Sequence, residues 1–220
     1  MSRQGDAVLF DIDGTLVDST YHHALAWHRA FSRLGEPPPM WRIHRTIGMG
    51  GDKLVAEVAG EATEAEHGDE LRDAWREEYL EIRTEVQPLA GAADLVRELA
   101  ADGYRVALAS SGDPQFAREA IELLDIGDDT EVLTTADDVE DSKPEPDLVG
   151  VTLERLGDVD RAVFVGDTPY DVEAAGRAGM GCIAVLTGGF SRGELSEAGA
   201  SLVVESLSEL VGTDWTPYLT

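Results

Sequence analysis

The stretch Ala7-Val8-Leu9-Phe10-Asp11-Ile12-Asp13-Gly14-Thr15 decides the fold of this chain. Its four leading apolar residues are typical of a short buried strand, and the chain then turns abruptly polar. Gly14 can adopt the backbone conformations that a tight exit from a sheet requires. We therefore expect Asp11 and Asp13 at the carboxyl end of a strand, where open α/β sheets bind their ligands.

Further short apolar runs alternate with amphipathic segments along the rest of the chain. This alternation predicts βαβ units and a Rossmann-like α/β core with a parallel sheet. The other predicted strands are Val106–Ala109, Val132–Thr134, Ala162–Val165, Ile183–Leu186 and Leu202–Val204. The predicted helices of this core are Ala92–Ala101, Phe116–Leu124, Leu148–Leu156 and Val172–Ala178.

Residues 17–87 break this rhythm, because they contain helical patterns but no convincing strand. The patterns predict helices near His22–Leu34, Gly51–Ala59 and Glu64–Arg83, with the run of prolines at 37–39 as a stiff connector. Pro88 and Gly91 mark the return to the sheet. We therefore predict a core of residues 1–16 and 88–220 and an inserted α-helical cap of residues 17–87.

Composition narrows the function before any motif is considered. The formal net charge is −27, which disfavours binding to nucleic acid or to an anionic membrane surface. Hydrophobic residues make up 43% of the chain, but no apolar run approaches the length of a membrane span. The single cysteine, Cys182, excludes an intramolecular disulfide, and the N-terminus lacks a signal-peptide pattern. We expect a cytoplasmic enzyme; the acidity fits either a salty habitat or simple solubility.

Asp11 and Asp13 are the first candidates for chemistry. A carboxylate at a strand end can attack phosphorus, and a second one can move a proton to or from the leaving oxygen. An isolated Asp-x-Asp is more often an acidic turn, but the full pattern Asp-x-Asp-Gly-Thr after an apolar strand is a much stronger signal.

Three other predicted strand ends carry polar residues. Ser110 and Ser111 offer hydroxyl donors for phosphate oxygens, although serines there are often turn formers. Lys143 lies in a proline-bracketed loop and is one of only two lysines. These features favour a fixed ammonium that neutralises charge on a transferring phosphoryl group over a solvated lysine on the surface. Asp167 and Asp171 are oxygen ligands suited to Mg²⁺, or else a helix-capping turn.

These four motifs stand in the order and spacing of the haloacid dehalogenase-like hydrolase superfamily, which the chain resembles over nearly its whole length. The helical insert is similar to the C1 cap of that family, and the chain looks like the branch of phosphoglycolate phosphatase and β-phosphoglucomutase. The resemblance implies a Mg²⁺-dependent phosphatase of a small phosphorylated metabolite.

The resemblance also implies roles for individual residues. Asp11 would be the nucleophile that forms an aspartyl-phosphate, and Asp13 the general acid and base. Ser110 would hold the phosphoryl oxygens, and Lys143 would bridge the phosphate and Asp11. The implied Mg²⁺ ligands are Asp11, Asp13 through its backbone carbonyl, Asp167 and Asp171, the last either directly or as an orienting residue.

Other activities within the superfamily are weighed against this hypothesis. Asp13 argues against dehalogenation, which needs no proton for its leaving group, and Lys53 lies in a different cap context from the lysine of phosphonatases. The mutase alternative draws on Tyr21, His23 and Trp27, but Gly51 falls where that enzyme has an arginine. A non-catalytic binding module on the same fold is the alternative of a different class.

Specificity is expected from the cap and from the strand-end loops. Simple packing or surface exposure is the competing interpretation for each cap residue, and the sequence does not indicate an oligomeric state. The candidate substrate contacts are Ser111, His23, Arg45, Met49, Gly50 and Lys53.

Overall fold

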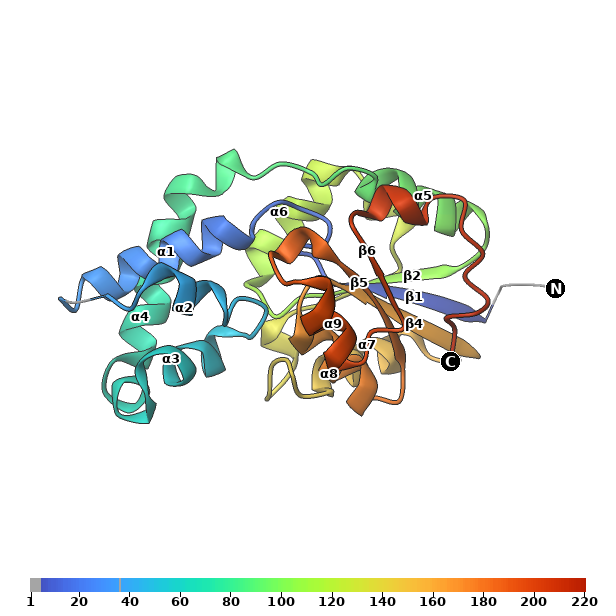
Figure 1. The fold of residues 1–220 in the computed structure, drawn as a ribbon. Helices are drawn as coiled ribbons and strands as arrows, with labels where there is room; N and C mark the ends of the chain where they lie inside the picture. The colour runs from blue at the N-terminus through green and yellow to red at the C-terminus, as the bar shows by residue number, and fades with distance from the viewer. Residues whose placement is uncertain (1–4, 36) are drawn as a thin grey trace.

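The computed structural model describes residues 5–35 and 37–220, and its core is built on one parallel sheet. The strands run in the order β3-β2-β1-β4-β5-β6. Figure 1 labels β1, β2, β4, β5 and β6 in the part of the molecule that holds this sheet. Their bounds are β1 Asp6–Phe10, β2 Arg105–Ala109, β3 Val132–Thr134, β4 Arg161–Gly166, β5 Gly181–Val185 and β6 Leu202–Val204. The predicted α/β class and parallel sheet are confirmed.

The sheet is buried on both faces, as the nearly continuous apolar runs of its strands require. Val8 and Phe10 of β1 face helices α5 (Ala92–Ala101) and α6 (Pro114–Leu124). Ala7 and Leu9 face helices α7 (Asp147–Leu156), α8 (Pro169–Arg177) and α9 (Arg192–Ala198). The result is a three-layer core in which β1 is flanked by β2 on one side and by β4 on the other.

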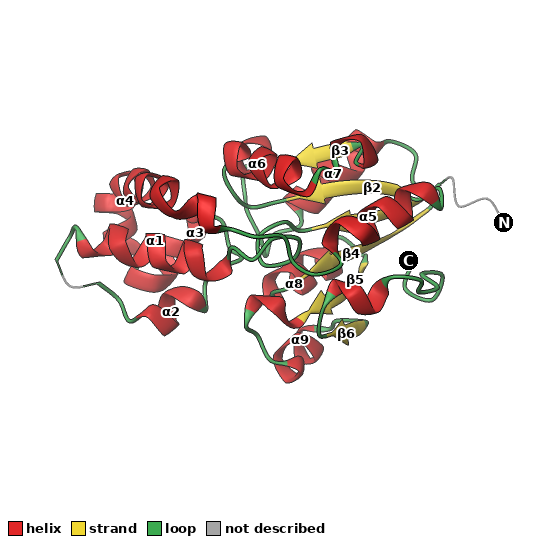
Figure 2. Cartoon of the chain, turned by 90° about the horizontal axis from the view of Figure 1, so that it is seen from above, coloured by secondary structure: helices red, strands yellow, loops and turns green. Residues whose placement is uncertain are grey.

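A separate group of helices lies beyond the carboxyl ends of these strands (Figure 2). It consists of α1 Thr20–Ser32, α2 Met40–His44, α3 Gly51–Ala59 and α4 Glu61–Ile82. These helices enclose a small apolar core of their own, around Trp27, Phe31, Leu54 and Leu71. The insert is helical, as predicted, while the exact division at residues 16/17 and 87/88 stays a prediction.

Two details of the sequence-based assignment were wrong. The five-residue helix α2 was not anticipated, because it is too short to show a helical period. Strand β5 ends at Val185, and Leu186 begins a 3₁₀ turn that bends the chain toward Gly188. Apart from these, each predicted strand and each of the longer helices is present within a few residues of its expected position. Among the described residues, no helix is both long and apolar enough to cross a bilayer.

Candidate active site

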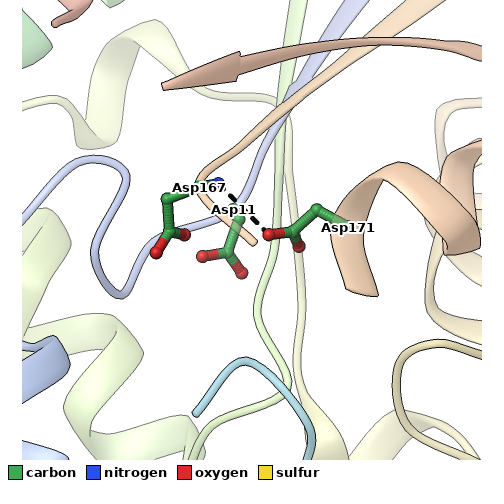
Figure 3. Close-up of side chains that lie close together, drawn as sticks. All are labelled: Asp11, Asp167 and Asp171. Carbon is green, nitrogen blue, oxygen red and sulfur yellow. Dashed lines mark hydrogen bonds between the residues drawn. The ribbon is translucent and has the colours of Figure 1, made fainter. Parts of the chain in front are cut away.

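Three buried carboxylates converge where β1 and β4 end, at the point where the strand order reverses (Figure 3). Asp11 follows β1, Asp167 follows β4, and Asp171 lies in the first turn of α8. One carboxylate oxygen from each lies within 4.8 Å of the others, and each residue is at most 6% exposed. Such a set of hard oxygen donors can hold a metal ion.

Asp171 is positioned by the capping box of α8. Thr168 is the N-cap residue, and its hydroxyl accepts from the Asp171 backbone N–H at 3.3 Å. In return the Oδ2 atom of Asp171 accepts from Thr168 N at 3.0 Å and from Asp167 N at 3.2 Å. This leaves Oδ1 to face the centre of the cluster, where it lies 2.8 Å from Lys143 Nζ.

Lys143 supplies the one buried ammonium of the cluster. Its side chain is 1% exposed, and Nζ donates to Asp11 Oδ1 and, at 3.1 Å, to the Ala109 carbonyl oxygen. It also forms an ion pair with Asp171 Oδ1. Its pKa is raised because the attraction of Asp11 and Asp171 outweighs the cost of burial. The ammonium therefore stays charged and ties the ends of β1, β2 and α8 together.

One ammonium does not offset three buried carboxylates. Burial, together with Asp171 and Asp13, raises the pKa of Asp11 from 3.8 to about 7 despite the opposing effect of Lys143. Burial and the charges of Asp171 and Asp11 raise the pKa of Asp167 well above its usual value. Asp167 Oδ1 accepts from Thr15 Oγ1 at 2.8 Å, but Oδ2 is buried and has no hydrogen-bond partner in the part of the chain described. A cation beside Asp167 Oδ2 would offset the excess negative charge of the carboxylates and give this oxygen a partner. These residues therefore fit a divalent metal.

Asp13 lies beside this cluster but faces the cap. Its Oδ1 atom accepts from Ser19 Oγ at 2.6 Å and lies 2.9 Å from His23 Nε2. Burial alone would raise the pKa of Asp13, but His23 and Ser19 lower it below its usual value. His23 is held in place by stacking on Tyr79, with ring centroids 4.1 Å apart. Asp13, the candidate general acid and base, is thus held by contacts with the start of α1.

The predicted phosphate-binding serines lie on the other side of Asp13. Ser110 is buried, and its Oγ lies 3.5 Å from Asp13 Oδ2 and accepts from the backbone N–H of Gly112 at 3.0 Å. The Oγ atom of Ser111 is buried and lacks a hydrogen-bond partner among the described residues. Both hydroxyls can therefore be donated to an incoming oxygen.

A cavity of about 390 Å³ separates these side chains from the cap. Of the predicted cap contacts, His23 and Met49 line it, together with Ser110 and Ser111 from the core. The adjacent Gly50 does not line the cavity but instead donates its N–H to Ser142 Oγ at 3.0 Å. The size suits a ligand larger than phosphate alone.

Two predicted cap contacts lie away from this cavity. Arg45 pairs with Glu194 at 2.5 Å and packs over the Phe190 ring. Lys53 donates to the Ser142 carbonyl oxygen at 2.9 Å and lies 3.4 Å from Asp141. Arg45 joins the cap to α9 and to the loop before it, and Lys53 joins the cap to the loop before α7. Their contact with a substrate stays a prediction that the geometry does not favour.

Several residues of the site were not singled out from the sequence. Thr15 belongs to the first motif, so its place beside Asp167 followed from the same signal. Ser19 stands only six residues after Asp13, but nothing in its neighbours marked it. Arg76 bridges the cap to Asp113 at 2.8 Å and to Gln115 at 2.6 Å, and no local pattern predicts such a long-range contact.

A capped α/β sheet with a buried carboxylate cluster and lysine at its ligand-binding edge is the architecture of an enzyme that acts on a charged small molecule. The chain belongs to the family of haloacid dehalogenase-like hydrolases, whose family model matches residues 8–185. The resemblance predicted from the four motifs is thereby confirmed.

Individual relatives agree with this assignment. Phosphoglycolate phosphatase of Pseudomonas putida is 30% identical over 212 residues, which cover 93% of this chain and 78% of that protein. Phosphoglycolate phosphatase of Aquifex aeolicus is 29% identical over 192 residues, covering 82% and 84%. The crystal structure of a hydrolase from Pseudomonas syringae superposes with a TM-score of 0.88 at 31% identity, covering 94% of this chain and 96% of that one.

Proposed function

We propose that this protein is a Mg²⁺-dependent phosphatase that hydrolyses a small phosphorylated metabolite, of the phosphoglycolate or sugar phosphate type, through an aspartyl-phosphate on Asp11. The observation that carries this proposal is the position of Asp11, buried at a strand end, held by Lys143 and lying at the base of a cavity that Asp13 also lines. The relatives that bear the name phosphoglycolate phosphatase support the same reaction class.

In the first half of the proposed reaction, a carboxylate oxygen of Asp11 attacks phosphorus and the bond from phosphorus to the ester oxygen breaks. Lys143 fixes Oδ1 of Asp11 and offsets charge on the phosphoryl oxygens, while Ser110 donates its hydroxyl to one of them. Asp13 gives its proton to the departing ester oxygen. Because His23 and Ser19 favour the ionised form of Asp13, their contacts must loosen for this step.

In the second half, Asp13 takes a proton from a water molecule as the water oxygen attacks the phosphorus of the aspartyl-phosphate. The bond between phosphorus and Asp11 then breaks, which restores the carboxylate and releases phosphate. The cap excludes bulk water from the intermediate, so that only a water activated by Asp13 reacts productively.

Mg²⁺ would be held by Asp11 and Asp167, with the backbone carbonyl of Asp13 as a further proposed ligand. When bound, it supplies positive charge that lets an anionic phosphoryl group approach the carboxylates. Asp171 makes three hydrogen bonds through Oδ2 and an ion pair with Lys143 through Oδ1, so we propose that it orients the site rather than ligating the metal directly.

The test is phosphate release from a panel of phosphorylated metabolites, with Mg²⁺ or with EDTA, by the wild type and by Asp11→Asn. We expect Mg²⁺-dependent release from at least one compound and none from the variant, which should keep the circular dichroism spectrum of the wild type. Interconversion of glucose phosphate isomers without net release would favour the mutase. No turnover in either assay would favour a non-catalytic binding module.

A further inference from the structure

The cavity above Asp11 has an aromatic wall on its cap side. Trp27 of α1 and Trp75 of α4 both line it, and their rings stack with centroids 5.4 Å apart. The opposite wall is formed by the loops that follow β2 and β3, including Gly112 and Val139. A ligand whose phosphate rests near Asp11 therefore has its other end between two tryptophans and two core loops.

Three acidic side chains of this lining are free to act on a ligand. Asp73 lies on α4 of the cap, Asp137 in the 3₁₀ turn Ala136–Asp138 after β3, and Glu140 in the loop that follows that turn. All three are exposed, and none forms a hydrogen bond or ion pair with another residue in the described parts of the chain. They approach the cavity from both the cap and the core.

The positive charges of the same lining are already engaged. Among the described residues, only Arg72 and Arg76 bring a lysine or arginine charge to the cavity. Arg72 Nη1 lies 2.9 Å from Glu64 Oε1, and Arg76 Nε lies 2.8 Å from Asp113 Oδ2. Unpaired charge around the non-phosphate end of a ligand is therefore negative.

Carboxylates accept hydrogen bonds and donate none, so a ligand that satisfies them must bring donors. Hydroxyl groups provide such donors without adding charge, and the apolar C–H face of a sugar or polyol can pack on an aromatic wall. A carboxylate on the ligand has no donor to offer and is repelled by like charges at close range.

We propose that this cavity selects phosphate monoesters whose leaving group is uncharged and bears hydroxyl groups, such as sugar or polyol phosphates, and discriminates against a leaving group that carries a carboxylate. This inference rests on the proposed phosphatase function and specifies its substrate class. Asp73, Asp137 and Glu140 are the residues to which we assign the discrimination.

The test compares two esters of the same length, 2-phosphoglycolate and 2-hydroxyethyl phosphate, which differ in a carboxylate against a hydroxymethyl group. We expect kcat/KM of the wild type to favour the hydroxyethyl ester by about tenfold, the factor produced by one like-charge contact of about 1.4 kcal/mol. The double variant Asp137→Asn/Glu140→Gln should shift this ratio toward phosphoglycolate.

A matched control is the double variant Asp128→Asn/Glu154→Gln, which changes the net charge equally at exposed residues outside the cavity lining. It should leave the ratio of the wild type unchanged. A wild-type preference for phosphoglycolate, or an equal shift in both double variants, would overturn the inference while leaving the phosphatase intact. If the wild type hydrolyses neither these two esters nor any compound of the wider panel, the proposed function is overturned, and this inference with it.

Discussion

Replacing Lys143 by Met should lower the free energy of unfolding of the metal-free protein by about 3–5 kcal/mol at pH 8. Met keeps much of the volume of the buried stem, so little of this loss comes from packing. The cost arises because Asp11 and Asp171 lose their shared ammonium, while both carboxylates remain buried. Removal of one partner from such a network leaves uncompensated charge in a medium of low dielectric constant.

The loss should be smaller at pH 5 than at pH 8. Lys143 lowers the pKa of Asp11 against the upward effect of burial, so its removal lets that pKa rise above about 7. A group whose pKa is raised in the folded state contributes stability at low pH, and the contribution is lost as pH rises through the folded pKa. At pH 5 the Asp11 carboxylate of the variant can take up a proton, which reduces the penalty.

Urea unfolding followed by tryptophan fluorescence measures this difference in EDTA at both pH values. The matched control is Lys53→Met, the other lysine of the chain, which loses a partly exposed pair with Asp141 and should cost about 1 kcal/mol or less. A loss below about 1 kcal/mol for Lys143→Met at pH 8, or an equal loss at both pH values, would refute the reasoning.

Three further predictions follow from the same geometry. Without metal, the unfolding free energy of the wild type relative to Asp11→Asn should fall between pH 5 and pH 8, because the raised pKa of Asp11 penalises its charged form. Urea titrations measure this difference, and Mg²⁺ should reverse the trend. Gly188→Ala should reduce Mg²⁺-dependent activity by at least about tenfold, since the added Cβ would collide with Asp167 Oδ2; activity within twofold of the wild type at equal Mg²⁺ would contradict this. Arg76→Ala removes the contacts of α4 with Asp113 and Gln115. Steady-state kinetics should then give a KM raised about threefold, and the loss of stability should be about 1 kcal/mol or less. An unchanged KM would argue against a role of Arg76 in cap placement.

The main features of the site could be predicted because parallel strands bring their carboxyl ends to one edge. Once Ala7–Phe10 and Ala162–Val165 are assigned as strands of one parallel sheet, Asp11 and Asp167 are expected at the same edge. The pairing of β1 with β4 then brings them close together. The strand starts were less accurate, because Asp6, Arg105 and Arg161 are polar residues that the hydrophobic pattern does not include. Here the backbone pairing extends beyond the apolar run.

The cap contacts were predicted less well because they depend on how helices pack rather than on local pattern. Arg45 and Lys53 have long side chains with several acceptors in reach, and their pairing with Glu194 and Ser142 is set by the docking of the cap on the core. The contact of His23 with Asp13 depends in the same way on the direction in which α1 leaves the first motif. Spacing along the chain does not determine that direction.

The most direct test of the proposed mechanism is the covalent state of Asp11 during turnover. Asp13→Asn should still accept a phosphoryl group from an activated ester but hydrolyse it slowly, because the base that activates water is missing. Mass spectrometry of acid-quenched Asp13→Asn should therefore find one added phosphoryl group on the peptide that contains Asp11, labile to hydroxylamine and absent from Asp11→Asn/Asp13→Asn. Turnover by the wild type without any phosphorylation of that peptide in the single variant would contradict the account.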